Sequence, residues 1–142
     1  MKKLFVISAI LVAFVFNTSG QIGEVIGYPL SAIKEYEPGG VESTVSGKKI
    51  YTYHTFDNEE NKRVTNKCFF NEKNICFEVH IYPLDEIWRV LFFKSYNTNT
   101  DRYVKLADGE WSYIGFKDYF IKITLCVGAD DKVYYKHFSN LI

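Results

Sequence analysis

The stretch that decides the fold is Val64–Tyr82, VTNKCFFNEKNICFEVHIY, which predicts two strands joined by the polar turn Asn71–Asn74. From Ile75 onward the side chains alternate, with Ile75, Phe77, Val79 and Ile81 on one face and Cys76, Glu78, His80 and Tyr82 on the other. Successive side chains of a strand point to opposite faces, so the first set predicts a core face and the second a partly solvated one. The hairpin therefore predicts an antiparallel sheet with a helix layer behind it.

The first twenty residues have the pattern of a secretory signal peptide. Lys2 and Lys3 precede the apolar run Leu4–Phe16, and small and polar residues lead to Gly20. The run is too short to cross a bilayer, and no later stretch is long enough, so we expect no membrane span in the mature chain. We expect cleavage near Gly20 and a periplasmic or secreted protein with a single domain over residues 21–142. A buried first helix is the alternative interpretation.

Charge and composition narrow the class of partner. The chain has 17 Lys and Arg against 17 Asp and Glu, and losing two lysines with the signal peptide leaves 15 against 17, a net charge of −2. A basic stripe is missing from the sequence, which argues against nucleic acid as a partner. The 12 Phe and 11 Tyr are many for one domain, and most are expected in the core and in cross-strand pairs.

The remaining elements follow from local signals. Tyr28–Tyr36 predicts a short helix that Pro29 begins, and Val41–Gly47 reads as connection. Asp85 predicts the cap of a helix from Glu86 to about Tyr96, although IWRVLFF is short and apolar enough for a strand; the cap and spacing favour the helix. Strands are expected at 49–56, 103–106, 111–114, 119–127 and 132–138, with a polar loop at 57–62 and a turn at 115–118.

The order of elements reads as helix-strand-strand-strand twice over, in residues 29–82 and 83–138. It predicts the α+β class, with one antiparallel sheet built mainly from two hairpins and two short helices packed on one face. A resemblance lies in this order of elements, in the Gly27-Tyr28-Pro29 entry to a helix, and in the segments ICFEVHIY and YFIKITLCV. In these features the chain resembles two-unit envelope proteins grouped around the beta-lactamase-inhibitor-protein fold and small outer-membrane assembly lipoproteins. The resemblance implies protein binding by the open sheet face or by loops. The lipid-anchor Cys of the assembly lipoproteins is missing.

Chemistry-bearing residues form no recognisable motif. Cys76, His80 and Cys126 would converge if their strands share a sheet, yet the close Cys or His pairs of structural zinc sites are missing. All the histidines, His54, His80 and His137, fall in predicted strands, where packing is their ordinary role. We therefore expect no metal, no cofactor and no catalytic residue.

Two functional hypotheses remain. The favoured one is a non-catalytic binding or inhibitor module whose partner is an envelope or extracellular protein. Its candidate binding residues, on the sheet face, are Glu78, His80, Tyr82, Tyr51, Tyr53 and Tyr135. The alternative is a small extracytoplasmic hydrolase or redox enzyme with Cys and His on the solvated face. The sequence leaves the oligomeric state open.

The pairing of Cys68 with Cys76 depends on the register of the hairpin. A loop of residues 71–73 would place the cysteines directly opposite each other. A loop of residues 72–74, with Asn74 left-handed, would make them diagonal neighbours, and a loop of residues 71–74 would put them on opposite faces. The first register alone suits a disulfide, so we expect Cys76 and Cys126 to be unbridged.

Overall fold

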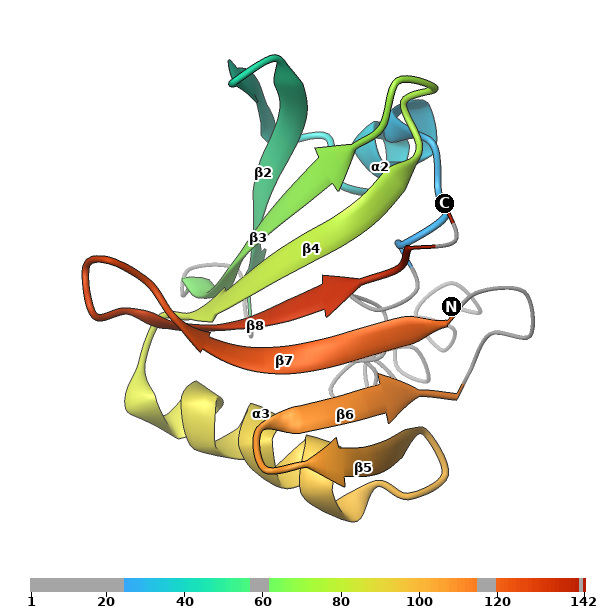
Figure 1. Ribbon diagram of the computed structural model, residues 1–142. Coiled ribbons are helices and arrows are strands. Elements are labelled where there is room, and N and C mark those ends of the chain that lie inside the picture. Colours follow the sequence, from blue (N-terminus) through green and yellow to red (C-terminus); the bar gives the residue numbers. More distant parts are fainter. Residues whose placement is uncertain (1–24, 57–61, 115–119, 141) are drawn as a thin grey trace, which may run out of the picture.

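The computed structural model describes residues 25–56, 62–114, 120–140 and 142. Within them one helix is followed by four strands, and this order occurs twice (Figure 1). The first set is α2 (Leu30–Tyr36), β1 (Val41–Val45), β2 (Lys48–Phe56), β3 (Lys62–Phe70) and β4 (Cys76–Pro83). The second set is α3 (Glu86–Thr98), β5 (Tyr103–Ala107), β6 (Glu110–Tyr113), β7 (Ile121–Val127) and β8 (Val133–Phe138).

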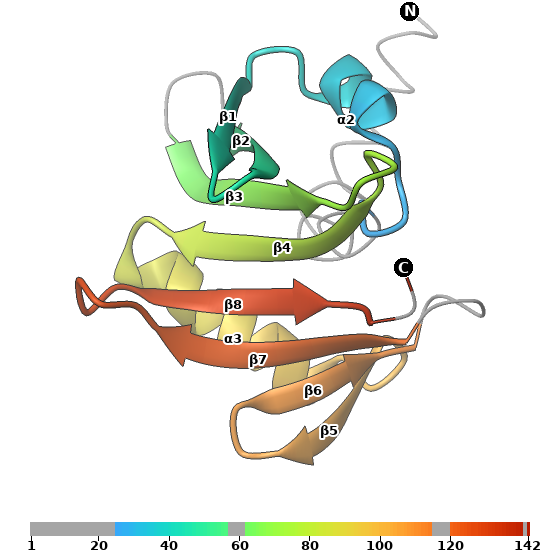
Figure 2. The ribbon, with the colours of Figure 1, turned by 45° about the horizontal axis from the view of Figure 1, so that its top comes forward.

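All eight strands form one antiparallel sheet in the order β1-β2-β3-β4-β8-β7-β6-β5. The last strands of the two sets, β4 and β8, pair with each other at the centre, and each set continues outward by hairpins to an edge (Figure 2). The predicted α+β class and antiparallel sheet are confirmed. The expectation of three strands in each unit was wrong, because each unit has four. In the first unit the expected connection Val41–Gly47 contains β1, and in the second all four strands correspond to segments that were expected individually.

The β3–β4 hairpin adopts the second of the three possible registers. Its loop is residues 72–74, with Asn74 in the left-handed region at φ 60°. The side-chain oxygen of Asn71 accepts hydrogen bonds from the amides of Lys73 at 2.9 Å and Ile75 at 3.0 Å, which fixes the turn. Cys68 and Cys76 therefore share a face as diagonal neighbours. Both thiols are free and buried.

A β-bulge at the start of β4 corrects the predicted faces. Phe70 pairs with Cys76 but Phe69 pairs with Glu78, which leaves Phe77 as the extra residue. Val79 and Ile81 lie in the core as predicted, whereas Cys76 is buried with them and Phe77 is only half-buried. The expectation that Phe77 shares the core face and Cys76 the solvated one was therefore wrong. Strict alternation holds only from Glu78 onward.

Local capping explains where α3 begins. The carboxylate of Asp85 accepts a hydrogen bond from the Trp88 amide at 3.0 Å, so the predicted cap and the preference for a helix are confirmed. The helix ends at Thr98, slightly later than expected. No helix in the described parts of the chain is long and apolar enough to cross a membrane. The predicted signal peptide, most of the 57–62 loop and the 115–118 turn lie outside the described residues.

The core combines one face of the sheet with side chains from both helices. Leu30 and Ile33 of α2 and Phe92 and Tyr96 of α3 belong to the same buried cluster as alternate strand residues. Aromatic rings fill the part under α3: Tyr96 lies 5.1 Å from Trp111 and 4.9 Å from Tyr135, centre to centre. Figure 2 shows α3 behind β7 and β8.

Close packing of the Tyr51 side chain against the backbone at Gly40 holds the segment between α2 and β1 in place. The hydroxyl of Tyr51 donates to the carbonyl of Glu37 and accepts from the Gly40 amide at 3.0 Å. A Cβ at Gly40 would overlap the Tyr51 ring, whereas at Gly39 it would meet open space. Position 40 therefore requires glycine for steric reasons.

Candidate functional site

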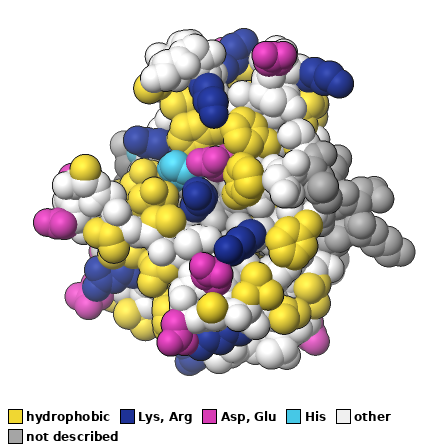
Figure 3. Space-filling model, in the orientation of Figure 1, with side chains coloured by type: hydrophobic (Ala, Val, Ile, Leu, Met, Phe, Trp, Pro, Cys, Tyr) yellow, Lys and Arg dark blue, Asp and Glu magenta, His cyan; other side chains and the backbone are white. Residues whose placement is uncertain are grey.

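The sheet face that does not contribute to the buried cluster, the open face, carries a continuous row of polar side chains. Strand register places its members side by side across six strands: Thr52, Lys67, His80, Lys136, Thr124 and Glu110. Figure 3 views the molecule from this side and shows basic side chains distributed among hydrophobic ones. His80 lies in the row between two lysines.

Glu78 and His80 form a hydrogen-bonded pair on β4, two residues apart on the same face. The Nε2 of His80 lies 2.5 Å from a carboxylate oxygen of Glu78, and the side chains are 15% and 20% exposed. Burial raises the pKa of Glu78, but the hydrogen bond from His80 and the charges of His80, Lys136 and Lys48 outweigh it, so its pKa lies below the usual value. The carboxylate thus stays ionised and holds the imidazole in one orientation.

Three aromatic rings, those of Phe69, Tyr134 and Tyr82, lie near the His80 imidazole. Its ring centre lies 4.5 Å from that of Phe69 and 4.8 Å from that of Tyr134, and Tyr134 in turn stacks on Tyr82 at 4.9 Å. We call Phe69, His80, Tyr82 and Tyr134 the ring cluster. Burial, together with nearby Asp130 and Cys126, raises the pKa of Tyr82, so its hydroxyl stays neutral. The cluster combines flat rings with hydroxyl and imidazole groups, a composition that suits protein recognition.

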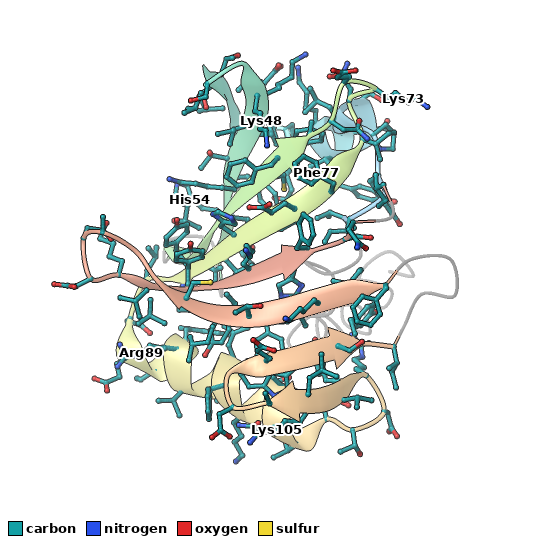
Figure 4. The ribbon with its side chains drawn as sticks, viewed as in Figure 1. Lys48, His54, Lys73, Phe77, Arg89 and Lys105 are labelled. Carbon is teal, nitrogen blue, oxygen red and sulfur yellow. The ribbon has the colours of Figure 1, made fainter. Side chains whose placement is uncertain are left out.

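Three lysines lie over aromatic rings of the open face. The Lys67 ammonium is 5.2 Å from the ring centre of Tyr82, Lys48 is 5.4 Å from that of Phe77, and Lys136 is 5.9 Å from that of Phe138. Figure 4 shows Lys48 and Phe77 next to each other on this face. These three ammonium groups outnumber the one carboxylate of Glu78, so together these side chains carry a net positive charge.

Cys126 lies at the border of the ring cluster, directly opposite Tyr134. Burial and the hydrogen-bonded Cys126 thiol raise the pKa of Tyr134. The thiol also lies 3.6 Å from the carbonyl oxygen of Thr124. Cys126 therefore interacts with Tyr134 and Thr124, while the hydrogen bond of His80 goes to Glu78.

The predicted binding residues divide between the two faces of the sheet. Glu78, His80 and Tyr82 lie together on the open face. Tyr51, Tyr53 and Tyr135 were expected on the sheet surface, but they are 1%, 6% and 0% exposed in the core. Burial raises the pKa of Tyr135 to about 12, and its hydroxyl donates to the Arg89 carbonyl at 3.3 Å.

The residues that sequence reasoning missed are Phe69, Tyr134, Lys67 and Lys136. Their strands were predicted, and in β8 Tyr134 and Lys136 alternate with the buried Tyr135 and His137. The alternation was visible in KVYYKHF, but which set faces outward depends on the pairing of β8 with β4.

The other two histidines have separate environments. The Nδ1 of His54 lies 3.0 Å from the Thr65 hydroxyl. His137 is fully buried in the core, where its Nε2 is 2.9 Å from the Tyr96 hydroxyl and its Nδ1 has no hydrogen-bond partner among the described residues. Burial lowers the pKa of His137 to about 3.

A cavity of about 550 Å³ adjoins the ring cluster, between the start of α3 and the β7–β8 turn. Lys67 and Tyr82 line it from the open face, so the two features are continuous. Charged side chains of both signs complete its wall: Asp85, Glu86, Arg89, Asp130, Asp131 and Lys132. In the described parts of the chain, no group of three or more His, Cys, Asp and Glu side chains is placed to hold a metal ion.

Comparison of the chain with protein-family models, curated proteins and solved structures finds no match.

Proposed function

We propose that this chain is a non-catalytic binding or inhibitor module, and that its partner protein docks on the open face of the sheet. The observation that carries the proposal is the ring cluster, in which three aromatic rings and the oriented imidazole of His80, from three strands, pack together in tilted and stacked contacts. In this proposal both helices pack on the opposite face and leave the rings accessible. The pattern of residues 1–20 supports a site of action outside the cytoplasm.

The charges of the open face favour a partner whose contact surface is acidic. Lys48, Lys67 and Lys136 border the rings, and Glu78 is already engaged with His80. Carboxylates of a partner would pair with these ammonium groups, while apolar side chains cover the rings. Such complementarity mainly accelerates association, and salt weakens it.

Photo-crosslinking from within the face tests the proposal. A photoreactive phenylalanine analogue replaces Tyr82 in one variant and Tyr36, which is 70% exposed on α2, in the matched control. We expect a discrete adduct with one partner from Tyr82 and none from Tyr36. The double variant Lys67→Glu, Lys136→Glu should remove the adduct. Equal labelling from both positions, or an adduct insensitive to the charge reversal, would contradict docking on this face.

One observation favours the alternative, a small extracytoplasmic hydrolase. The Glu78–His80 pair at 2.5 Å has the geometry of a general base held by a carboxylate. However, Cys126 contacts Tyr134, and Cys68 and Cys76 lie in the core, so the pair has no cysteine nucleophile beside it among the described residues. Hydrolysis of activated esters that falls by roughly 100-fold or more in His80→Gln would establish this alternative.

A further inference from the structure

Helix α3 is apolar on both of its sides. Its inner side buries Phe92 and Tyr96 and partly covers Trp88. Its outer side exposes four large apolar side chains: Ile87 is 69% exposed, Val90 54%, Leu91 45% and Phe93 41%. Four large apolar side chains exposed on one side of a helix are more than scattered surface positions, and such a patch is typical of an interaction site.

The outer side is complementary to itself. At 3.6 residues per turn, Glu86, Ile87, Val90 and Lys94 fall on the side opposite the buried residues, and Phe93, whose ring also packs against Trp111 at 5.7 Å, lies at the border of that side. In an antiparallel helix pair whose two-fold axis passes through Val90, residues equally spaced before and after Val90 meet. Glu86 then faces the partner's Lys94, and Ile87 faces the partner's Phe93. Each contact occurs twice.

The charges at the two ends are available for this arrangement. Glu86 is 77% exposed; its carboxylate lies 3.0 Å from Arg89 of its own helix, and the side chain also lines the cavity beside the ring cluster. The Lys94 ammonium is exposed, and among the described residues it has no ion-pair partner. A parallel pair would instead place Glu86 beside Glu86 and Lys94 beside Lys94. The sequence of α3 thus favours a second copy of the same chain in the antiparallel orientation.

We propose that α3 is a self-association element, through which two copies of this chain form a two-fold symmetric dimer with antiparallel α3 helices and Val90 at the axis. The occupant of the apolar surface is a second copy because the pairing of charges and of apolar residues closes on itself without any other partner. The interface lies on the outer side of α3 and meets the surface proposed above for a partner protein only at Glu86, which also lines the cavity beside the ring cluster.

Sedimentation velocity on the purified protein tests the dimer. At up to about 0.1 mM we expect a dimer for the wild type and a monomer for Val90→Lys, because two ammonium groups would meet at the axis. Lysine is a better helix former than valine, so the monomer should remain folded. Val41→Lys is the matched control, since Val41 is 67% exposed on the β1 edge, and it should stay dimeric. A monomeric wild type, or a Val90→Lys dimer, overturns the proposal.

Charge reversal tests the orientation. Glu86→Lys alone and Lys94→Glu alone each create two like-charge contacts in the antiparallel pair, and each should weaken dimerisation about tenfold. The double variant restores opposite charges and should recover the wild-type dissociation constant. A parallel pair would not respond in this way, because reversing either charge leaves like charges together. Failure of the double variant to recover therefore contradicts the antiparallel arrangement.

Discussion

The buried imidazole of His137 should make folding stability depend on pH in a range where few carboxylates titrate. The side chain is fully buried between β4 and β7 residues, and burial lowers its pKa from 6.5 to about 3. In the folded protein it is therefore neutral above about pH 4, whereas in the unfolded chain it gains a proton near pH 6.5. The unfolded state binds more protons as the pH falls, so stability falls with it.

The size of the effect follows from the two pKa values. Between about pH 7 and about pH 5 the imidazole of the unfolded chain goes from roughly a quarter protonated to almost fully protonated, while that of the folded chain stays neutral. This lowers the free energy of unfolding by about 2 kcal/mol. The loss continues toward the folded pKa near 3. Urea unfolding followed by fluorescence of the buried Trp111 at each pH measures it.

A variant whose side chain at position 137 cannot take up a proton isolates the contribution of His137 to the pH dependence of stability. His137→Gln retains a polar group that can meet the Tyr96 hydroxyl but cannot change charge in this range. We expect the variant to be less stable than the wild type at about pH 7, and to lose about 2 kcal/mol less on going to about pH 5. Equal losses in both proteins would refute the reasoning. So would a wild-type His137 ring resonance that titrates near its ordinary pKa in the folded state, a measurement that does not require the variant to fold.

Two further predictions concern steric fit and the cysteines. Gly40→Ala should lower the free energy of unfolding by roughly 1–3 kcal/mol, because its Cβ would displace a buried tyrosine ring, while Gly39→Ala should change it by less than about 0.5 kcal/mol. Thermal denaturation measures the stability of both variants. Equal stabilities would contradict the steric argument. Denatured, unreduced protein should contain three free thiols, and in the native protein a thiol reagent should label Cys126 first, because Cys68 and Cys76 are buried. A single free thiol after denaturation would mean that a disulfide has formed.

Features that depend on neighbouring residues could be predicted from the sequence. The Asp85 cap, the left-handed Asn74 and the burial of Val79 and Ile81 all rest on interactions within a few residues or on a period of two. The same reasoning placed Glu78, His80 and Tyr82 on one face. These residues form the part of the candidate site that local patterns determine.

Features that depend on pairing between strands distant in the sequence could not be predicted from it. The bulge at Phe77 reverses the faces of two residues, and its position is fixed only when β4 meets β3. Tyr51 suits a core or a surface equally well, and its burial follows from the hydrogen bonds of its hydroxyl with the segment before β1. The ring cluster needs Tyr134 beside His80, which requires β8 to pair with β4 across a long stretch of chain.

The proposed dimer interface lies on the outer side of α3 and meets the proposed binding face only at Glu86, which lines the cavity beside the ring cluster. The inner side of α3 packs against the rings of β8 and β6 through Tyr96, so its outer side points away from the sheet, and the open face points the other way. A two-fold dimer through α3 would therefore leave both open faces uncovered and directed outward. Two identical faces on one particle can engage two copies of a partner, which raises the apparent affinity without any additional contact where partners are arrayed on a surface. Because β4 carries Glu78, His80 and Tyr82 and leads directly into α3, one continuous segment of chain supplies residues to both surfaces.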